Sequence, residues 1–253
     1  AGEYLLNNGL STPEIVSELV DGRLASETIT IPEGYTLAQV AELLETKGLA
    51  SKEEFYAVAA QEDFPYKFLE ESPKGERRLE GYLFPDTYRV TRGNSVRSLI
   101  DEMLKRFDQE MEDLDYPARA QKVGLTLHEA VTLASLVERE AKIDEERPLI
   151  AGVIHNRMEK SMLLQIDATV QYALGTNKPQ IYYKDLEVDS PYNTYKNSGL
   201  PPGPIAMPGR ASLLAAVEPA ETAYLYYVAK PDGSHAFATN YAEHEANKER
   251  YQQ

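Results

Sequence analysis

Several residue types and motifs are missing from this chain, and each absence removes a class of function. There is no cysteine among its 253 residues, which excludes disulfides, zinc–thiolate sites and thiol nucleophiles but leaves the redox compartment open. No apolar run reaches the roughly 18 residues that a membrane-spanning helix needs. A GxSxG serine elbow and a glycine-rich phosphate loop are also absent, so a serine hydrolase or a P-loop enzyme is not expected.

Histidine is scarce and gives no metal signature. The four histidines are His128, His155, His235 and His244, and their spacing matches neither HExxH nor another ligand pattern. We therefore expect neither a metal site nor another cofactor.

Positive charge is in deficit. Against 41 acidic residues the chain has 26 Lys and Arg, a formal net charge of −15 and a pI near 4.8. The densest basic stretch, residues 74–78, is short. A polyanion would be repelled, so no nucleic-acid partner is expected.

The hydrophobic content of 42% allows either one large domain or a small one beside a medium one. Residues 69–78 are polar and rich in breakers, which predicts a boundary near residue 75. Strands and helices are segregated rather than strictly alternating, so we predict an α+β fold. The expected elements are strands at 4–6 and 28–31, helices starting near residues 12, 37, 51 and 95, and a hairpin over 224–238.

Residues 125–141 (LTLHEAVTLASLVEREA) predict a buried helix that ends in two acids. Thr126 and Glu129 form a capping-box pattern at its start. Helical spacing places Glu138 on the stripe of Val131 and Ala134. Glu140 follows a second apolar side, so both acids are expected to face protein rather than water.

Two interpretations of Glu138 and Glu140 are open on this pattern. A carboxylate among apolar neighbours has a raised pKa and can act as a proton donor. Alternatively, each acid is neutralised by a nearby base and ties two helices together. The candidate bases are Arg139, Lys142, Arg147 and Arg157.

Two further segments carry polar side chains that suit a sugar-binding groove. In residues 164–169, Gln165, Asp167 and Thr169 would share one side if the backbone is extended, although Asp167 would otherwise serve only as a helix cap. In the breaker-rich stretch 182–208, aromatic faces and amide groups of the kind that bind sugars occur. They belong to residues 191–195 (PYNTY). With metal and nucleophile chemistry excluded, acid catalysis on a glycosidic bond is the remaining prediction.

These motifs, together with IPEG at 31–34, resemble the YceG-like endolytic murein transglycosylases. The matching segments are LASLVERE (133–140), HNRM (155–158), LQIDATV (164–170), YNTY (192–195) and GLPPGPI (199–205). The order is preserved across most of the chain. The chain departs from the family's usual Asp-Pro-Thr at residues 167–169 and from its Asn-Pro at residues 207–208.

The resemblance implies a LysM-like, βαβ-type module at residues 1–75 and a catalytic domain at residues 76–253 with a lysozyme-like buried-Glu helix. Glu138 would be the catalytic acid and base and Glu140 its support, with exchanged roles still open. The implied substrate-binding residues are Gln165, Asp167, Thr169, Tyr192, Asn193 and Thr194. The implied reaction cleaves the MurNAc–GlcNAc bond within glycan strands and leaves a 1,6-anhydro end.

The resemblance also implies peptidoglycan as the substrate, cell-wall synthesis proteins as partners, and the extracytoplasmic face of the bacterial membrane as the location. The family's N-terminal transmembrane anchor would precede Ala1. Three alternatives stay open: a peptidoglycan-binding scaffold without catalysis, a hydrolase that uses Asp167 as a second carboxylate, and an intracellular interaction protein.

Overall fold

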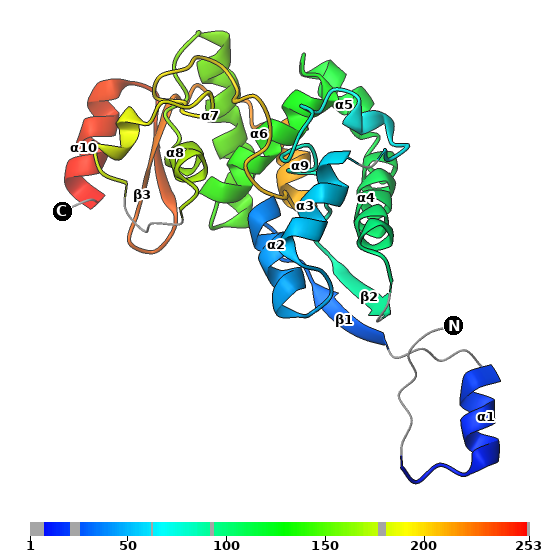
Figure 1. Cartoon of the computed structure of the whole chain (residues 1–253). Helices are drawn as coiled ribbons and strands as arrows, with labels where there is room; N and C mark the ends of the chain where they lie inside the picture. Colours follow the sequence, from blue (N-terminus) through cyan, green and yellow to red (C-terminus); the bar gives the residue numbers. More distant parts are fainter. Residues whose placement is uncertain (1–7, 21–25, 62, 92–93, 177–180, 252–253) are drawn as a thin grey trace.

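The computed structural model describes residues 8–20, 26–61, 63–91, 94–176 and 181–251. Within these ranges the fold is mixed: helices surround two small antiparallel sheets of two strands each (Figure 1). This confirms a mixed fold with antiparallel strands. The strand expected at residues 4–6 lies outside the described residues.

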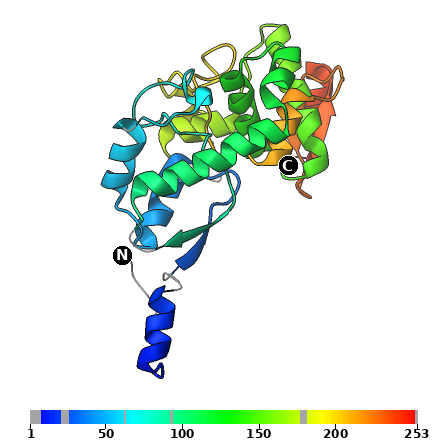
Figure 2. The same ribbon diagram turned by 90° about the vertical axis from the view of Figure 1, so that its right-hand side faces the viewer.

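The N-terminal helices begin close to where the sequence predicts. They are α1 (Thr12–Val20), α2 (Leu37–Thr46) and α3 (Lys52–Gln61). At the start of α2, Thr36 and Gln39 form a reciprocal capping box, which satisfies two backbone donors. Helix α1 lies apart from the other elements in two perpendicular views (Figures 1 and 2).

The first sheet joins residues on both sides of the predicted boundary. Strand β1 (Ser26–Thr30) pairs antiparallel with β2 (Thr87–Thr91), and Ile29 lies opposite Tyr88. One hydrophobic core also includes Leu44 and Phe107. The division at residue 75 stays a prediction, and it would separate two parts that share a sheet and a core.

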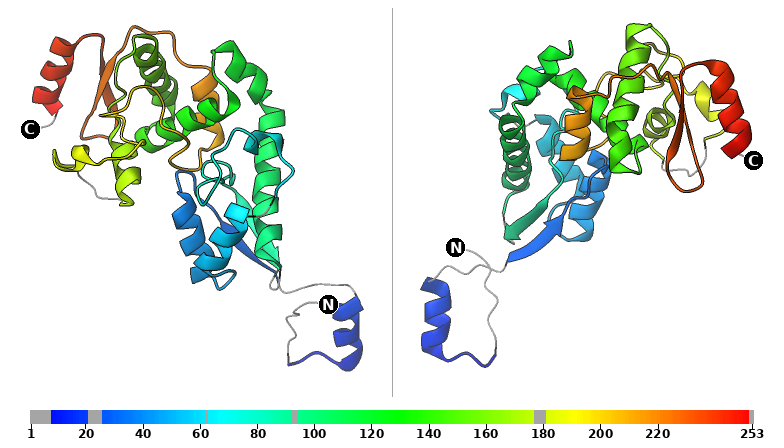
Figure 3. Two further views of the ribbon diagram at one scale, coloured as in Figure 1. Left: turned by 45° about the horizontal axis from the view of Figure 1, so that its top comes forward. Right: turned by 180° about the vertical axis from the view of Figure 1, so that it is seen from behind.

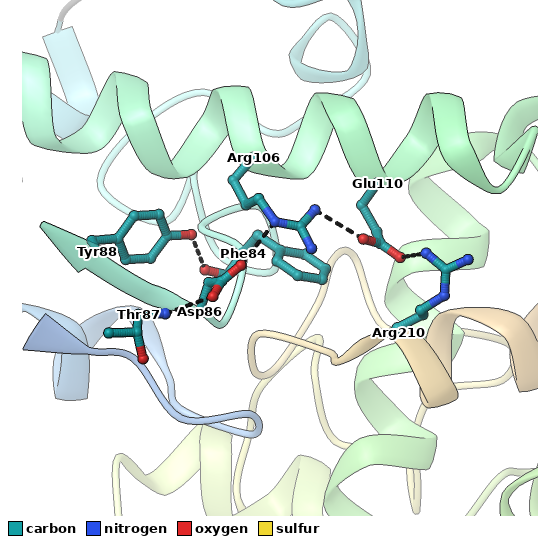
Figure 4. Close-up of polar contacts among 7 residues, drawn as sticks. All are labelled: Phe84, Asp86, Thr87, Tyr88, Arg106, Glu110 and Arg210. Atoms are coloured by element: carbon teal, nitrogen blue, oxygen red, sulfur yellow. Dashed lines mark hydrogen bonds and ion pairs between the residues drawn. The ribbon is translucent and has the colours of Figure 1, made fainter.

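A buried carboxylate links this sheet to the rest of the fold (Figure 4). Glu110 on α4 (Val96–Asp113) has a side chain that is 1% exposed and accepts from Arg106 at 2.8 Å. Arg210 pairs with its other oxygen. Arg106 also lies 2.8 Å from Asp86. The network therefore connects the start of β2 with α4 and with α9 (Arg210–Val217).

Helix α6 (Leu127–Glu140) lies at the centre and begins with the predicted capping box of Thr126 and Glu129. Its residues from Ala130 to Val137 are all buried. It packs against α7 and α9, and the two further views show this group between the N-terminal part and the C-terminal hairpin (Figure 3). The remaining connecting helices are α5 (Tyr116–Lys122), α7 (Arg147–Glu159) and α8 (Asp167–Leu174), with short turns η1 (Lys67–Leu69), η2 (Asp144–Glu146) and η3 (Asp185–Glu187).

The predicted hairpin is present, and α10 (Tyr241–Tyr251) follows it. Strands β3 (Tyr226–Ala229) and β4 (His235–Ala238) pair antiparallel, with Ala229 opposite His235. Helix α10 lies against this hairpin, at the end of the molecule opposite α1 (Figure 1). Among the described residues, no helix is both long and apolar enough to cross a membrane.

Candidate functional site

A pocket of about 450 Å³ opens at the C-terminal end of α6. The end of α6, the start of α8, the hairpin and α10 all contribute to it. Its polar lining includes Glu140, Gln165, Asp167, Tyr195, Tyr227 and His235. Two of the predicted substrate-binding residues, Gln165 and Asp167, therefore meet one of the two predicted acids here.

Glu140 is the partly buried acid of this pocket. Burial raises its pKa, while a hydrogen bond from Tyr227 and the backbone N–H of Ala168 oppose that shift. The Tyr227 hydroxyl donates to Glu140 Oε2 over 2.9 Å. The negative charge of Asp167 raises the pKa further. A carboxyl group in this environment stays protonated to higher pH than a free glutamic acid.

Asp167 is the first residue of α8 and not its cap. The N-cap position is Ile166, and no side chain caps this helix. Asp167 Oδ1 instead accepts from the Tyr195 hydroxyl over 2.6 Å. Burial raises the pKa of Tyr195, as does this hydrogen bond, so its phenol remains a donor.

The loop before α8 is held by a buried arginine. Arg157 Nη1 donates to the carbonyls of Leu163 and Leu164 over 3.1 and 2.8 Å. Gln165 has a φ of 52°, and its backbone N–H donates to the carbonyl of Thr194 over 3.1 Å. The expectation that Gln165, Asp167 and Thr169 share one face of an extended segment is wrong. A helix begins at Asp167, and it turns Thr169 into the interior.

Three other predicted substrate-binding residues lie inside the protein and do not line the pocket. Thr169, Asn193 and Thr194 are fully or almost fully buried. The Asn193 amide donates to the carbonyls of Leu186 and Val188. Thr194 Oγ1 accepts from the N–H of Ile166 over 2.9 Å and bonds the Thr169 hydroxyl. Their polar groups are thus used within the protein.

Tyr192, from the same motif, is not among the residues that line the pocket. Its ring contacts that of Tyr172 at 4.9 Å between centroids, and the Arg77 guanidinium lies 5.5 Å from the Tyr192 ring.

Glu138 points to another side of α6. Two helical positions correspond to about 200° around the axis, so Glu138 and Glu140 face nearly opposite ways. Glu138 Oε2 lies 3.3 Å from Arg147 Nη1, and its side chain is only 7% exposed. The same oxygen accepts from the backbone N–H of Gly209 over 3.0 Å. For Glu138, the predicted alternative of an ion pair between helices is confirmed.

Several polar residues of the pocket were not predicted as site residues. Tyr227 and His235 belong to the hairpin, which the sequence predicts only as a secondary-structure element. Tyr195 stands in the quoted YNTY motif, and Arg157 was considered only as a partner for an acid. These residues share only a polar or aromatic side chain at the edge of a predicted element. That feature does not indicate which of them come together in the folded protein.

Comparison with known proteins adds an independent result. The model of the YceG-like family matches residues 1–250. An endolytic murein transglycosylase of Bacillus subtilis (strain 168) is 39% identical over 263 residues, which cover 99% of this chain and 72% of that protein. Its counterpart in Streptococcus pneumoniae (strain D39) is 37% identical, and the match covers 98% of this chain but half of that protein.

A solved structure is also similar. The crystal structure of a YceG-like protein from Listeria monocytogenes superimposes with a TM-score of 0.78 at 36% identity, over 96% of this chain and 83% of that one. The matches in sequence and in structure both extend over nearly the whole chain, so this protein belongs to the YceG-like family.

Proposed function

We propose that this protein is an endolytic lytic transglycosylase that cleaves the MurNAc–GlcNAc bond within peptidoglycan strands. The family membership and the relatives named endolytic murein transglycosylase support the activity and the substrate. The observation that carries the mechanism is Glu140 at a polar pocket, where desolvation raises its pKa.

We infer that Glu140, and not Glu138, is the acid. Of the two possibilities left open by the sequence, the exchanged roles fit the geometry better. Glu140 faces the pocket, whereas Glu138 is engaged by Arg147 and the Gly209 N–H. The Glu138 carboxylate is occupied by these two donors and does not line the pocket. Glu138 would then support α6 rather than the reaction.

The chemistry needs one proton donor at the leaving oxygen. Protonated Glu140 gives its proton to the glycosidic oxygen as positive charge develops at C1 of MurNAc. The 6-hydroxyl of the same sugar attacks C1 and loses its proton, which closes the anhydro ring. No water is required, since the substrate supplies the nucleophile. In its simplest form the Glu140 carboxylate takes up the hydroxyl proton.

A hydrolase is the second candidate, because Asp167 lies in the same pocket. A glycoside hydrolase needs a second carboxylate as a nucleophile or as a base for water. Asp167 already accepts a hydrogen bond from the Tyr195 hydroxyl over 2.6 Å, so one of its two oxygens is occupied. The hydrolase is therefore the less well supported of the two candidate functions.

Mass spectrometry of the cleaved glycan tests this proposal. The wild-type protein should cut purified strands at internal positions and leave new anhydro-muramic acid ends. Reducing muramic acid ends would support the hydrolase instead. Binding without cleavage, also in the presence of synthesis enzymes, would support the non-catalytic scaffold.

We also infer the module, the location and the partners that the family resemblance implies. Residues 1–75 would act as a LysM-like module that contacts glycan, and the protein would work at the extracytoplasmic face of the membrane beside wall-synthesis proteins. Capture of undigested glycan strands by the whole chain, weakened by substitutions on the exposed face of α2, would support the first point.

A further inference from the structure

Glu146 and His235 form a second acid–base pair, of which His235 lines the pocket of Glu140. His235 Nδ1 lies 2.7 Å from Glu146 Oε2. The two side chains are 6% and 14% exposed. Glu146 comes from η2, close after α6, and His235 begins β4. An imidazole oriented by a buried carboxylate is a recurring arrangement for proton transfer.

The contact fixes which ring nitrogen is available. Glu146 as a carboxylate can only accept, so the proton between the two groups belongs to Nδ1. Neutral His235 therefore carries a lone pair on Nε2. Among the described residues, no side chain or carbonyl forms a hydrogen bond with Nε2, and this atom is not fully buried. Since His235 lines the pocket and Nδ1 is taken by Glu146, Nε2 is the ring nitrogen left for a ligand there.

Anchoring of the strand does not account for this arrangement. The backbone N–H of His235 already donates to both carboxylate oxygens of Glu146, over 3.0 and 3.1 Å. Those two bonds hold β4 to η2 whatever side chain stands at position 235. The imidazole therefore adds something other than attachment.

His235 is also close to the proposed acid. Its ring packs edge-on against that of Tyr227, with 5.4 Å between centroids, and Tyr227 bonds Glu140. The charge of His235 lowers the pKa of Glu140. His235 contacts Glu146 on η2 and Tyr227 on β3. The other titratable and charged groups that line the same pocket are Glu140 on α6, Arg157 on α7, Asp167 on α8, Tyr195, and Tyr241, His244, Glu245 and Lys248 on α10.

We propose that His235, held by Glu146, is the base that accepts the proton of the attacking sugar hydroxyl. This inference rests on the proposed function and assigns the second half of its proton cycle. The C1–O bond to the leaving sugar breaks while Glu140 protonates that oxygen. The bond from C1 to the 6-oxygen forms, and its proton passes to Nε2, giving an imidazolium next to Glu146. Transfer of this proton back to Glu140 restores both groups, so no proton is gained or lost overall.

The test is the pH dependence of anhydro-end formation on purified glycan strands. In the wild type, kcat should fall on the acidic side, because a general base works only in its unprotonated form. His235→Gln should lower kcat by about 10²–10⁴-fold and remove that acidic limb. Glu146→Gln keeps the hydrogen-bonding shape but removes the charge, so the acidic limb should move to lower pH. A purely structural pair would not produce that movement.

His155→Gln is the matched control. His155 Nε2 contacts the carbonyl of Ala216, away from the pocket, so this variant should keep the wild-type profile. A folded His235→Gln protein with wild-type kcat and an unchanged acidic limb would overturn the inference.

A second measurement does not depend on the variants being stable. The ¹⁵N shifts of the wild-type imidazole near neutral pH should report the Nδ1–H tautomer, and an Nε2–H tautomer would contradict the base role. The proposed function fails separately, because it is lost only if the wild-type protein makes no anhydro ends.

Discussion

The hydroxyl of Tyr227 lies 2.9 Å from Glu140 Oε2 and joins the C-terminal hairpin to the last turn of α6. The two residues are 87 positions apart in the sequence, yet both line the pocket, because the hairpin folds back over the end of the helix. The partner of Glu138 is instead the guanidinium of Arg147. The two acids of one helix turn therefore differ in their partners, and the predictions below follow from that difference.

Glu140→Gln should lower transglycosylase activity by about 10²–10⁴-fold, because the variant loses the proton donor but keeps the side-chain shape. Glu138→Gln is the matched comparison and should retain most of the activity. Both are measured as anhydro ends formed per minute, with folding checked by circular dichroism. An inactive, folded Glu138→Gln protein beside an active Glu140→Gln protein would restore Glu138 as the acid.

Tyr227→Phe should extend activity to higher pH. Burial raises the pKa of Glu140, and the Tyr227 hydrogen bond lowers it again. Without the hydroxyl the pKa rises further, so Glu140 stays protonated longer and the basic limb of the pH–rate profile should move up by about one unit. Tyr224→Phe, whose ring packs on Phe237, is the control. If the basic limb does not move, the ionisation that limits the rate at high pH belongs to a group other than Glu140.

Arg147→Met should destabilise the fold by about 3 kcal/mol, because it leaves the Glu138 carboxylate buried without a cation. The double variant Glu138→Gln/Arg147→Met should lose less than the sum of the two single changes. Urea unfolding of the four proteins measures this cycle. Additive losses would show that the two side chains do not stabilise each other.

Glu80→Gln should flatten the pH dependence of stability between about pH 4.5 and 7. Burial raises the pKa of Glu80 to about 7 from 4.5, against hydrogen bonds from the Leu37 N–H and the Tyr172 hydroxyl. The folded state therefore holds this proton more tightly than the unfolded chain. Its stabilising contribution is present below pH 4.5 and is lost as the pH rises through 7, by at most about 3 kcal/mol.

The measurement is thermal or urea unfolding at several pH values. The wild type should lose stability relative to the Gln variant as the pH rises through this window. Parallel curves for the two proteins would contradict the assignment.

Local patterns were sufficient for much of the secondary structure. The capping boxes at Thr36 and Thr126 involve residues three positions apart, so short-range sequence fixes these helix starts. Helical periodicity likewise predicted the long helix that follows Ser95. Strand β2 was missed, because its pairing with β1 joins residues about sixty positions apart.

The site shows the same division. The family motifs located Glu138, Glu140, Gln165 and Asp167, but they did not separate residues that line the pocket from those that support it. Asn193 illustrates why. Its amide is suited to a sugar hydroxyl, yet η3 and the residue after it present two carbonyls, and the amide donates to these instead.

The sequence alone determined that α6 ends in two acids about 200° apart, since the helical period is a local property. Only the tertiary structure decided what each acid faces. Helices α7 and α9 bring Arg147 and the Gly209 N–H to Glu138, whereas β3 and β4 bring Tyr227 and His235 to the pocket of Glu140. The charge and the solvent exposure around each carboxylate depend on neighbours that are distant along the chain, and for Glu140 so does the raised pKa.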